Sequence, residues 1–226
     1  MKNKVVALVP MRHNSERVTG KNYRSFAGKP LFHYITKTLL DCHLISKVVI
    51  DTDSKIITDY VSKFFPQVEI IERPDNLRDG NTPMNDIILH DLSKTDSDFF
   101  LQTHSTNPLL QTDTITRAIQ KFFESYPDKD SLFSVSKFQK RLWNGSAKAV
   151  NHNPSVLIRT QDLEPLYEEN SCIYIFSKKN MEKFKNRIGA KPVIFEISKI
   201  ESLDIDDEED FIITENIYKS LNQQNS

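Results

Sequence analysis

The stretch KVVALVPMRHNSERVTGKNYRSFAGKPLFHYI, residues 4–35, decides the fold of this 226-residue chain. It begins with an apolar run from Lys4 to Val9, which is typical of a strand buried on both faces of a sheet. A polar loop, Pro10 to Asn22, follows this strand. Pro30 then stands at the start of an amphipathic segment, Pro30 to Leu40, which predicts a helix. The order strand, loop, helix indicates the first unit of an α/β fold.

The same alternation continues along the rest of the chain. Short apolar runs predict further strands, and longer amphipathic runs predict further helices. The strands are expected at 47–50, 68–71, 99–102, 132–135, 173–176 and 193–197, and the helices after Ser54 and at 84–92, 112–123 and 207–221. This order predicts an α/β protein with a mostly parallel sheet and helices on both faces. Ligands of such sheets bind at the carboxyl ends of the strands, so the loops that follow the strands are the candidate site.

One segment, at about 137–170, departs from the alternation. It mixes polar and aromatic residues without a clean period, and we interpret it as an arm within a single domain, 1–226. Phe138, Leu142 and Trp143 are too apolar for an arm that stands free in water. We therefore expect the arm to bury them against a second subunit.

Composition excludes several classes of protein. The 30 Lys and Arg balance 31 Asp and Glu, so the net charge of −1 argues against a bulk nucleic-acid binder. No stretch approaches the roughly 20 apolar residues of a membrane span, and the N-terminal apolar run is too short for a secretory signal. Two cysteines, Cys42 and Cys172, do not form a disulfide framework. We therefore expect a cytoplasmic protein with no membrane and no nucleic-acid partner.

The loop after the first strand is strongly basic. The first thirty residues hold seven basic side chains against one acid, Glu16, a local excess of 7 − 1 = +6. Arg12 and Lys21 can pair with phosphate oxygens, and Ser15 and Asn22 can donate hydrogen bonds to them. The loop matches neither the Walker A pattern nor the glycine-rich dinucleotide fingerprint. It is a candidate phosphate site, although a solvated charged loop would have the same composition.

Acidic residues gather near the C-terminal end, with seven of them between Glu201 and Asp210. Asp204 and Asp206 are two apart on an extended segment, so their side chains project to the same side and could share one Mg²⁺. Such an ion would neutralise charge on a phosphate leaving group. Asp206 followed by Glu209 is also a capping-box pattern for the last helix, so a purely structural interpretation stays open.

Several motifs in this order resemble those of the acylneuraminate cytidylyltransferases, the CMP-sialic acid synthetases and related CMP-keto-sugar-acid synthetases. The opening stretch is similar to the buried strand of that family followed by Arg-x-x-Ser, Lys-Asn and Gly-Lys-Pro-Leu. Weaker similarities follow the later strands, at 51–53, 73–74, 101–109 and 170–175. The stretch DIDDEEDF at 204–211 is similar to the family's closing Asp-Ile-Asp motif. The resemblance covers nearly the full length of the chain.

The resemblance implies a Rossmann-like nucleotidyltransferase that joins CTP to the anomeric hydroxyl of a keto-sugar acid, with Mg²⁺ as cofactor and pyrophosphate as leaving group. It also implies a homodimer formed through the arm. The binding roles carried over are the triphosphate for Arg12, Ser15, Lys21 and Asn22, the cytosine for Arg73 and the Asp79 to Thr82 loop, and the sugar acid for Gln102 and Asn170. His104, in the Gln-Thr-His-Ser loop, is a further candidate for the sugar acid, and a structural role for it stays equally open. Asp204 and Asp206 remain the candidates for the metal. The residues expected to act in catalysis are Arg12, Lys21 and Asp206.

The chain also departs from the pattern of the family. His13 stands where the family usually has a small residue, and Glu16 where it has a basic one. Tyr167, Glu168 and Glu169 occupy positions where the sialic-acid enzymes often carry an arginine for the sugar carboxylate. The sequence therefore does not name the sugar.

Two alternative functions stay open at this point. The Asp-x-Asp pattern also occurs in GT-A glycosyltransferases, which use nucleotide sugars, although there it usually follows a mid-chain strand. The altered positions are also compatible with a non-catalytic nucleotide- or sugar-binding relative. Binding of CTP without release of pyrophosphate would distinguish that last case.

Overall fold

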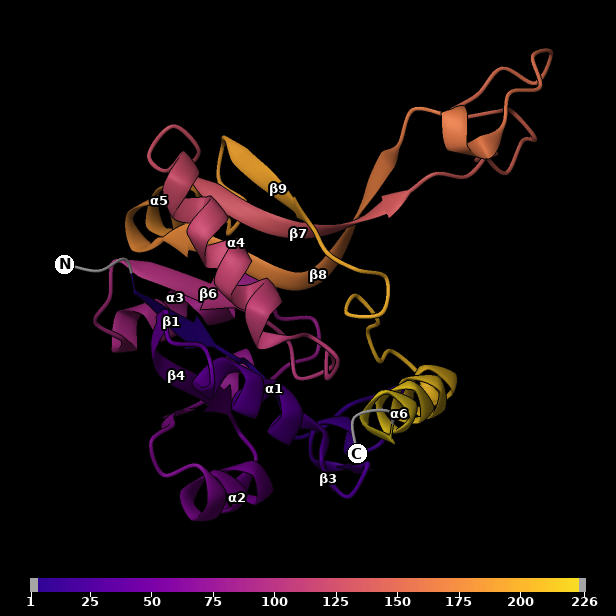
Figure 1. The fold of residues 1–226 in the computed structure, drawn as a ribbon. Coiled ribbons are helices and arrows are strands. Elements are labelled where there is room, and N and C mark those ends of the chain that lie inside the picture. The colour runs from indigo at the N-terminus through magenta and orange to yellow at the C-terminus, as the bar shows by residue number, and fades with distance from the viewer. Residues whose placement is uncertain (1–3, 224–226) are drawn as a thin grey trace.

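The computed structural model describes residues 4–223 and has a seven-stranded mixed sheet at its centre (Figure 1). The strands lie in the order β5-β4-β1-β6-β8-β7-β9. Their bounds are β1 (Val5–Leu8), β4 (Ile45–Thr52), β5 (Glu69–Glu72), β6 (Phe99–Gln102), β7 (Ser131–Phe138), β8 (Leu166–Ser177) and β9 (Pro192–Glu196). Only β8 runs antiparallel to its neighbours in this sheet, so the predicted, mostly parallel α/β fold is confirmed.

Helices cover both faces of the sheet. They are α1 (Leu31–Leu40), α2 (Lys55–Phe64) and α4 (Thr112–Ser125) on one face, and α3 (Met84–Lys94) and α5 (Lys178–Phe184) on the other. The last helix, α6 (Glu208–Gln223), packs instead against Phe26. Alternate residues of β1 enter two separate cores, because successive side chains of a strand point to opposite faces. Val5 and Ala7 pack with residues of α1, α2 and α4, whereas Val6 and Leu8 pack with residues of α3 and α5. The first strand is therefore apolar throughout because both of its faces are buried.

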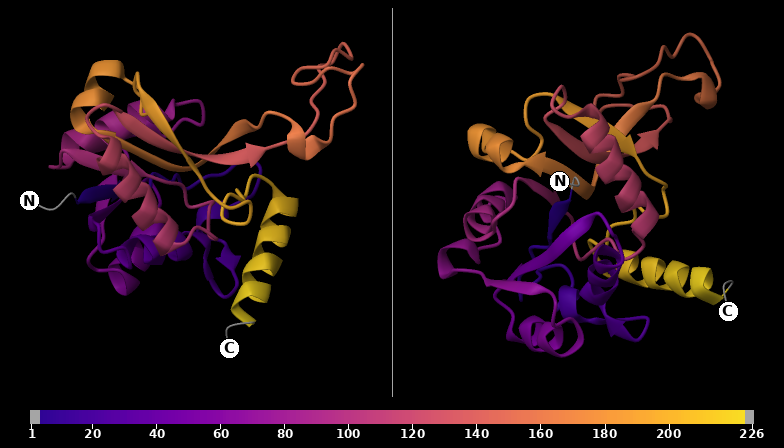
Figure 2. Two further views of the ribbon diagram at one scale, coloured as in Figure 1. Left: turned by 45° about the horizontal axis from the view of Figure 1, so that its top comes forward. Right: turned by 60° about the vertical axis from the view of Figure 1, so that its left-hand side comes forward.

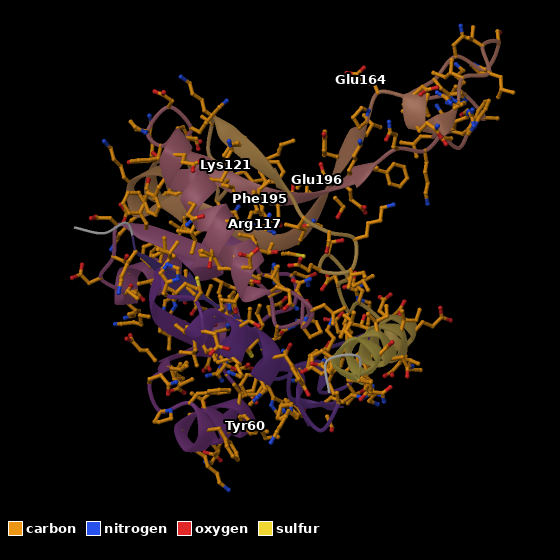
Figure 3. The ribbon with its side chains drawn as sticks, in the orientation of Figure 1. Tyr60, Arg117, Lys121, Glu164, Phe195 and Glu196 are labelled. Atoms are coloured by element: carbon orange, nitrogen blue, oxygen red, sulfur yellow. The ribbon has the colours of Figure 1, made fainter. Side chains whose placement is uncertain are left out.

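The arm is a long extension of β7 and β8. It stands away from the body in every view, and Glu164 lies on it just before the start of β8 (Figures 1, 2 and 3). The two strands stay paired as far as Phe138 and Leu166, so the irregular part spans 139–165 and is narrower than the predicted segment of 137–170. A short η3 turn (Thr160–Asp162) lies within it. β7 and β8 can continue beyond the body because backbone hydrogen bonds pair them, and this pairing does not require an alternation of apolar side chains.

A small hairpin after the first loop was not predicted from the sequence. It consists of β2 (Ser25–Phe26) and β3 (Lys29–Pro30), and its turn uses Gly28 at φ 90°. Phe26 of the hairpin meets Phe211 of α6 edge to face, with ring centroids 5.7 Å apart. This contact anchors α6, so the acidic segment that precedes the helix lies close to the basic loop.

Further short elements complete the fold. The turns η1 (Lys21–Tyr23) and η2 (Asp75–Leu77) lie in the loops after β1 and β5. At the far edge of the sheet, the guanidinium of Arg117 on α4 lies 5.7 Å from the ring centroid of Phe195 on β9 (Figure 3). Within residues 4–223, no helix is both long and apolar enough to cross a bilayer.

Candidate active site

Three loops that leave the carboxyl ends of β1, β5 and β6 line one cleft of about 350 Å³. This is the place at which parallel sheets bind their ligands. The charged side chains of its lining are the cations Arg12, Arg17, Lys21 and Arg73 and the carboxylates Glu16 and Asp79. A cleft with this excess of cations suits a polyphosphate.

A larger cavity of about 560 Å³ lies elsewhere, between α1 and α6. Its lining includes His33, Lys37 and Tyr218 but none of the side chains that the sequence assigns to substrate. The smaller, cationic cleft is therefore the better candidate for the active site.

Asn22 fixes the shape of the basic loop. Its Nδ2 donates to the backbone oxygen of Arg12 at 2.7 Å, and its Oδ1 accepts from the hydroxyl of Ser105 at 2.6 Å. The side chain thus joins the loop after β1 to the loop after β6. A Cβ at Gly80 would clash with the guanidinium of Arg12, so the loop after β5 also approaches closely.

Lys21 lies at the base of the cleft, with 9% of its surface exposed. Its ammonium donates to the backbone oxygen of Ile205 at 2.5 Å, which brings it beside the acidic segment. Burial lowers the pKa of Lys21, and the neighbouring carboxylates of Asp204 and Asp206 act in the opposite direction. The turn that holds Lys21 begins at Gly20 in the left-handed region, where a Cβ would strike the ring of Tyr23.

Asp204 and Asp206 both lie near Lys21, but they differ in burial and in their hydrogen-bond partners. Burial raises the pKa of Asp204, and its Oδ1 is buried with no hydrogen-bond partner among the described residues. Asp206 is half-exposed and pairs with Arg17 at 2.7 Å. One unsatisfied carboxylate oxygen beside a second carboxylate is a donor set that suits a hard cation such as Mg²⁺.

The capping box that the sequence suggested for Asp206 and Glu209 was wrong by one residue. The helix begins at Glu208, and the side chain of Asp207 accepts from the backbone N–H of Asp210 at 2.9 Å. The carboxylate of Asp210 in turn accepts from the N–H of Asp207 at 3.2 Å. The side chain of Asp206 is therefore free of the cap and turns towards Arg17.

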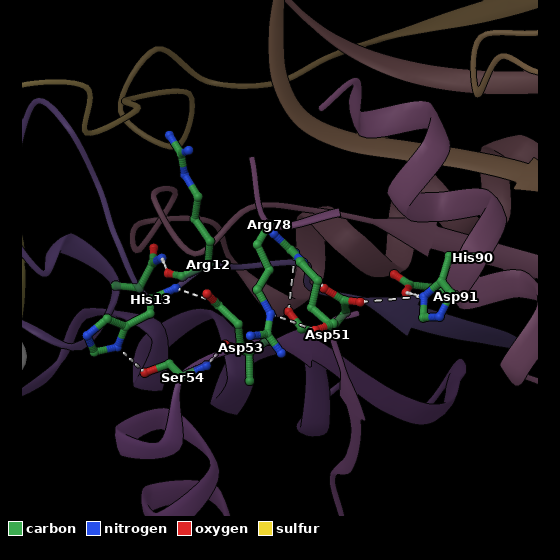
Figure 4. Close-up of polar contacts among 11 residues, drawn as sticks. Arg12, His13, Asp51, Asp53, Ser54, Arg78, His90 and Asp91 are labelled. Carbon is green, nitrogen blue, oxygen red and sulfur yellow. Dashed lines mark hydrogen bonds and ion pairs between the residues drawn. The ribbon is translucent and has the colours of Figure 1, made fainter. Parts of the chain in front are cut away.

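His13 has a structural role at the position where a small residue was expected. Its backbone N–H donates to Asp53 at 2.6 Å, and its Nδ1 lies 2.8 Å from the hydroxyl of Ser54 (Figure 4). Its ring stacks on that of Tyr23 at 5.1 Å. The imidazole thus ties the basic loop to the end of β4.

Arg73 forms an ion pair with Asp51, one of two neighbouring buried carboxyl groups. Its Nε donates to Asp51, whose carboxyl lies close to that of Asp91. Burial, followed by the nearby Asp51, raises the pKa of Asp91. Asp51, His90 and Asp91 bring potential ligand atoms within 4.8 Å of one another (Figure 4). Because Arg73 already neutralises Asp51, a proton on Asp91 fits this cluster better than a metal ion.

Gln102 and His104 form the other wall of the site. The amide Nε2 of Gln102 lies 3.1 Å from Nε2 of His104, and its Oε1 accepts from the guanidinium of Arg187 at 2.5 Å. Arginine can only donate, so this contact fixes the orientation of the amide. Burial lowers the pKa of His104 to about 3, with further contributions from Arg187 and Lys21, so its imidazole is neutral.

Asn170 has its hydrogen-bonding groups directed at its own sheet. Its Oδ1 accepts from the hydroxyl of Ser134 at 2.6 Å, and its Nδ2 donates to the hydroxyl of Ser136 at 3.0 Å. These contacts join β8 to β7 near a shift of their register. The structure thus surrounds Asn170 with β-sheet partners, whereas it gathers the predicted phosphate and base residues around the cleft.

The predicted residues divide into two groups by position. Those that line the cleft are Arg12, Ser15, Lys21, Asn22, Arg73, Thr82 and His104. Gln102 lies directly behind His104, while Asp204 and Asp206 flank Lys21. Arg187 and Asp91 were missed. Asp91 had a visible signal, an acid on the apolar face of α3, but nothing near Arg187 in the sequence pointed to the site.

Comparisons with known proteins fit this geometry. A family model described as cytidylyltransferase matches residues 6–225. The CMP-N,N'-diacetyllegionaminic acid synthase of Legionella pneumophila subsp. pneumophila is 30% identical and covers 98% of both chains. The N-acylneuraminate cytidylyltransferase of Escherichia coli O18:K1:H7 is 25% identical over 99% of this chain, which spans 54% of that enzyme.

A solved structure supports the fold independently. The structure titled as CMP:2-keto-3-deoxy-manno-octonic acid synthetase complexed with CTP superposes with a TM-score of 0.72. The match covers 96% of this chain and 99% of the other at 13% identity, so it concerns the fold alone. The family match, in contrast, spans nearly all of the chain. The protein therefore belongs to the cytidylyltransferase family that its motifs resemble, and it is a nucleotidyltransferase.

Proposed function

We propose that the protein transfers CMP from CTP to the anomeric hydroxyl of a nonulosonic, sialic-acid-like keto-sugar acid and releases pyrophosphate. The observation that carries the proposal is the full-length similarity to a CMP-N,N'-diacetyllegionaminic acid synthase, at 30% identity over 98% of both chains. The cationic cleft at the strand ends supports the proposal, because its lysine and arginine side chains could bind a triphosphate.

In this proposal, some residues around the cleft bind the triphosphate of CTP and others contact its cytosine base. Arg12, Ser15 and Lys21 would bind the triphosphate, because each lines the cleft with a cation or a hydroxyl. Asn22 would act mainly by holding the loop, since both ends of its amide already have protein partners. Arg73 and Thr82, from the loop after β5, would approach the cytosine.

The transfer itself is a displacement at phosphorus. The anomeric hydroxyl attacks the α-phosphorus, and its oxygen–phosphorus bond forms as the bond to the bridging oxygen breaks. Pyrophosphate leaves with the electron pair of the broken bond, and the proton of the hydroxyl passes to solvent water. Arg12 and Lys21 would stabilise the charge that moves onto pyrophosphate. Lys21 is buried and Arg12 is half-buried, so water screens their charges less than it would at the surface.

Asp204 and Asp206 would hold a Mg²⁺ ion in this proposal. The unsatisfied buried oxygen of Asp204 supports it, as does the nearby carboxylate of Asp206. When bound, the ion would neutralise phosphate charge and orient the triphosphate. Arg17 would have to release Asp206, or share it, when the metal binds.

We also propose that the protein acts in the cytoplasm as a homodimer formed through its arm. Both cysteines are free and buried, which fits a reducing compartment. Apolar side chains stand exposed on the arm, among them Trp143 at 53% and Leu157 at 89%. Such a surface is more stable when a second copy covers it.

Release of pyrophosphate tests the proposed function. The purified protein is mixed with CTP, Mg²⁺ and each of a panel of legionaminic, neuraminic, pseudaminic and octulosonic acids. Release with at least one nine-carbon acid, abolished by chelating the metal, is the expected result. Binding of CTP without release on any acid would instead support a non-catalytic relative, and activity only with a nucleotide sugar would support a glycosyltransferase.

A further inference from the structure

Arg187 is held in place by three elements next to the cleft. Its guanidinium donates to Oε1 of Gln102 on β6 at 2.5 Å and lies 3.6 Å from the ring centroid of Tyr174 on β8. Its backbone N–H donates to Asn85 on α3 at 3.4 Å. The side chain is therefore pre-organised although it belongs to the irregular segment between α5 and β9.

Arg187 is also half-buried, and among residues 4–223 no carboxylate forms a direct ion pair with its guanidinium. Seven other arginines of the described chain have an acid within 4.0 Å, namely Arg12, Arg17, Arg24, Arg73, Arg78, Arg117 and Arg159. Arg141, the other exception between residues 4 and 223, lies on the arm. Glu169, the acid across Tyr174, accepts the hydrogen bond of the Tyr174 hydroxyl. The charge of Glu169 acts on Arg187 from across the ring, but it forms no direct ion pair with the guanidinium. A partly buried charge that lacks a direct ion pair is costly, so Arg187 is suited to an anion from outside the chain.

The position of Arg187 relative to the cleft indicates which anion it would meet. Gln102, which it contacts, touches His104 of the cleft wall, and Asn85, which holds its backbone, follows Met84 of the same wall. Arg187 and Lys21 are both close enough to His104 to contribute to the lowered pKa of its imidazole. Two cations near one wall of the cleft suit a substrate pair that carries a triphosphate and a carboxylate.

We propose that Arg187 binds the carboxylate of the sugar acid, with Gln102 and Tyr174 holding its guanidinium in position. The inference rests on the proposed function and names the residue that selects an acid as acceptor. Gln102 and Tyr174 engage only part of the guanidinium, which has five N–H donors in a planar fork. The remaining donors can form a paired, charge-assisted contact with a carboxylate.

This assignment explains a departure noted in the sequence. The positions before Asn170 carry Tyr167, Glu168 and Glu169 instead of an arginine. Two of these side chains are acids and would repel a carboxylate. Arg187 follows β8 in the sequence and lies between α5 and β9. The positive charge that is absent at 167–169 is thus supplied by a different part of the chain.

The test compares a keto-sugar acid with its methyl ester, which lacks the negative charge. Arg187→Gln should raise the KM for the acid roughly 10- to 100-fold, the size expected for a lost hydrogen bond to a charged group, while kcat changes little. The KM for the ester should stay the same. Arg187→Lys should recover part of the loss, because it keeps the charge but not the fork.

Controls separate this role from general effects. Lys183→Gln removes one charge from the exposed face of α5, close in sequence, and should leave both KM values unchanged. Calorimetry with CTP and a melting curve should be the same for Arg187→Gln as for the wild type. A KM for the acid that does not rise, or that rises equally for acid and ester, would overturn the inference.

The proposed function and this inference can fail separately. Turnover by the wild type with an unchanged KM in Arg187→Gln would leave the function standing and remove Arg187 from it. If the wild type releases no pyrophosphate with any acid, the proposed function fails, and calorimetric binding of acid and ester to the CTP-loaded protein then decides on Arg187. Equal affinities of wild type and Arg187→Gln for the acid would reject it in that case too.

Discussion

Asp91 is buried on the apolar face of α3, beside Ile87 and Ile88, where burial and the carboxyl of Asp51 raise its pKa. Arg73 and His90 also face this carboxyl. The folded protein keeps the proton of Asp91 at a pH where the unfolded chain has lost it. The contribution of this group to stability is therefore complete below the ordinary carboxyl pKa and is lost as the pH rises towards the raised folded value.

Asp91→Asn should remove that pH dependence, because the amide stays neutral and can still donate to Asp51. The difference in Tm between variant and wild type should become more positive from about pH 5 to about pH 8. Melting curves across this range measure it. A difference that stays constant would mean that Asp91 binds no extra proton when the protein is folded.

Asp206 is the residue on which the metal assignment depends most. Asp206→Asn should remove most of the turnover at saturating CTP and leave the melting curve close to that of the wild type, since Asp207 and not Asp206 caps α6. Glu209→Gln, an exposed acid in the first turn of the same helix, is the matched control and should keep its activity. Near wild-type rates for Asp206→Asn would contradict the proposed metal site.

Site residues that belong to a recognisable motif could be predicted from the sequence. Site residues that stand outside any motif could not. The basic loop and the acidic segment were expected near phosphate, and the structure brings Lys21 within 2.5 Å of the backbone between the two aspartates. Arg187 had no such context, because its role depends on how a distant segment folds back onto β6. For Asn170 the sugar-binding role stays a prediction, since its amide contacts serines of β7.

At the scale of elements, buried strands and amphipathic helices were predictable because hydrophobic periodicity reports burial. The features of the fold that the sequence did not predict have local causes. The seven-residue helix α5 buries a single side chain, Met181, too few to make a period. The hairpin β2–β3 depends on positive φ angles at Ala27 and Gly28. The antiparallel direction of β8 leaves no mark, because alternation of side chains is the same in both directions.

The arm is an element whose exposed surface predicts its function. Leu157→Asp, at a side chain that is 89% exposed, should convert a dimer into a monomer, because a charge in an apolar interface loses its hydration without a partner. Light scattering coupled to size exclusion measures the mass. Ile56→Asp, on the exposed side of α2 at 51%, is the control and should stay dimeric. A wild-type protein that is already monomeric would contradict the proposed dimer.

At the scale of the whole molecule, the site follows from the direction of the strands. β1, β5 and β6 are parallel members of one sheet, so their carboxyl ends open towards the same edge, and their loops enclose the cleft. The hairpin β2–β3 and α6 bring the C-terminal acids back to this edge. The fold thus brings the basic loop and the acidic segment together, through the hydrogen bond from Lys21 to the backbone oxygen of Ile205, 184 residues later in the sequence.

The central claim is that this cleft makes a CMP–sugar acid from CTP. The most direct measurement is the mass of the product after incubation of the protein with Mg²⁺, a legionaminic-type acid and either CTP, UTP, ATP or GTP. We expect a product with the mass of CMP plus the acid less one water, formed with CTP and in an amount equal to the pyrophosphate released. Pyrophosphate without this adduct, or an adduct formed equally well from the other nucleotides, would contradict it.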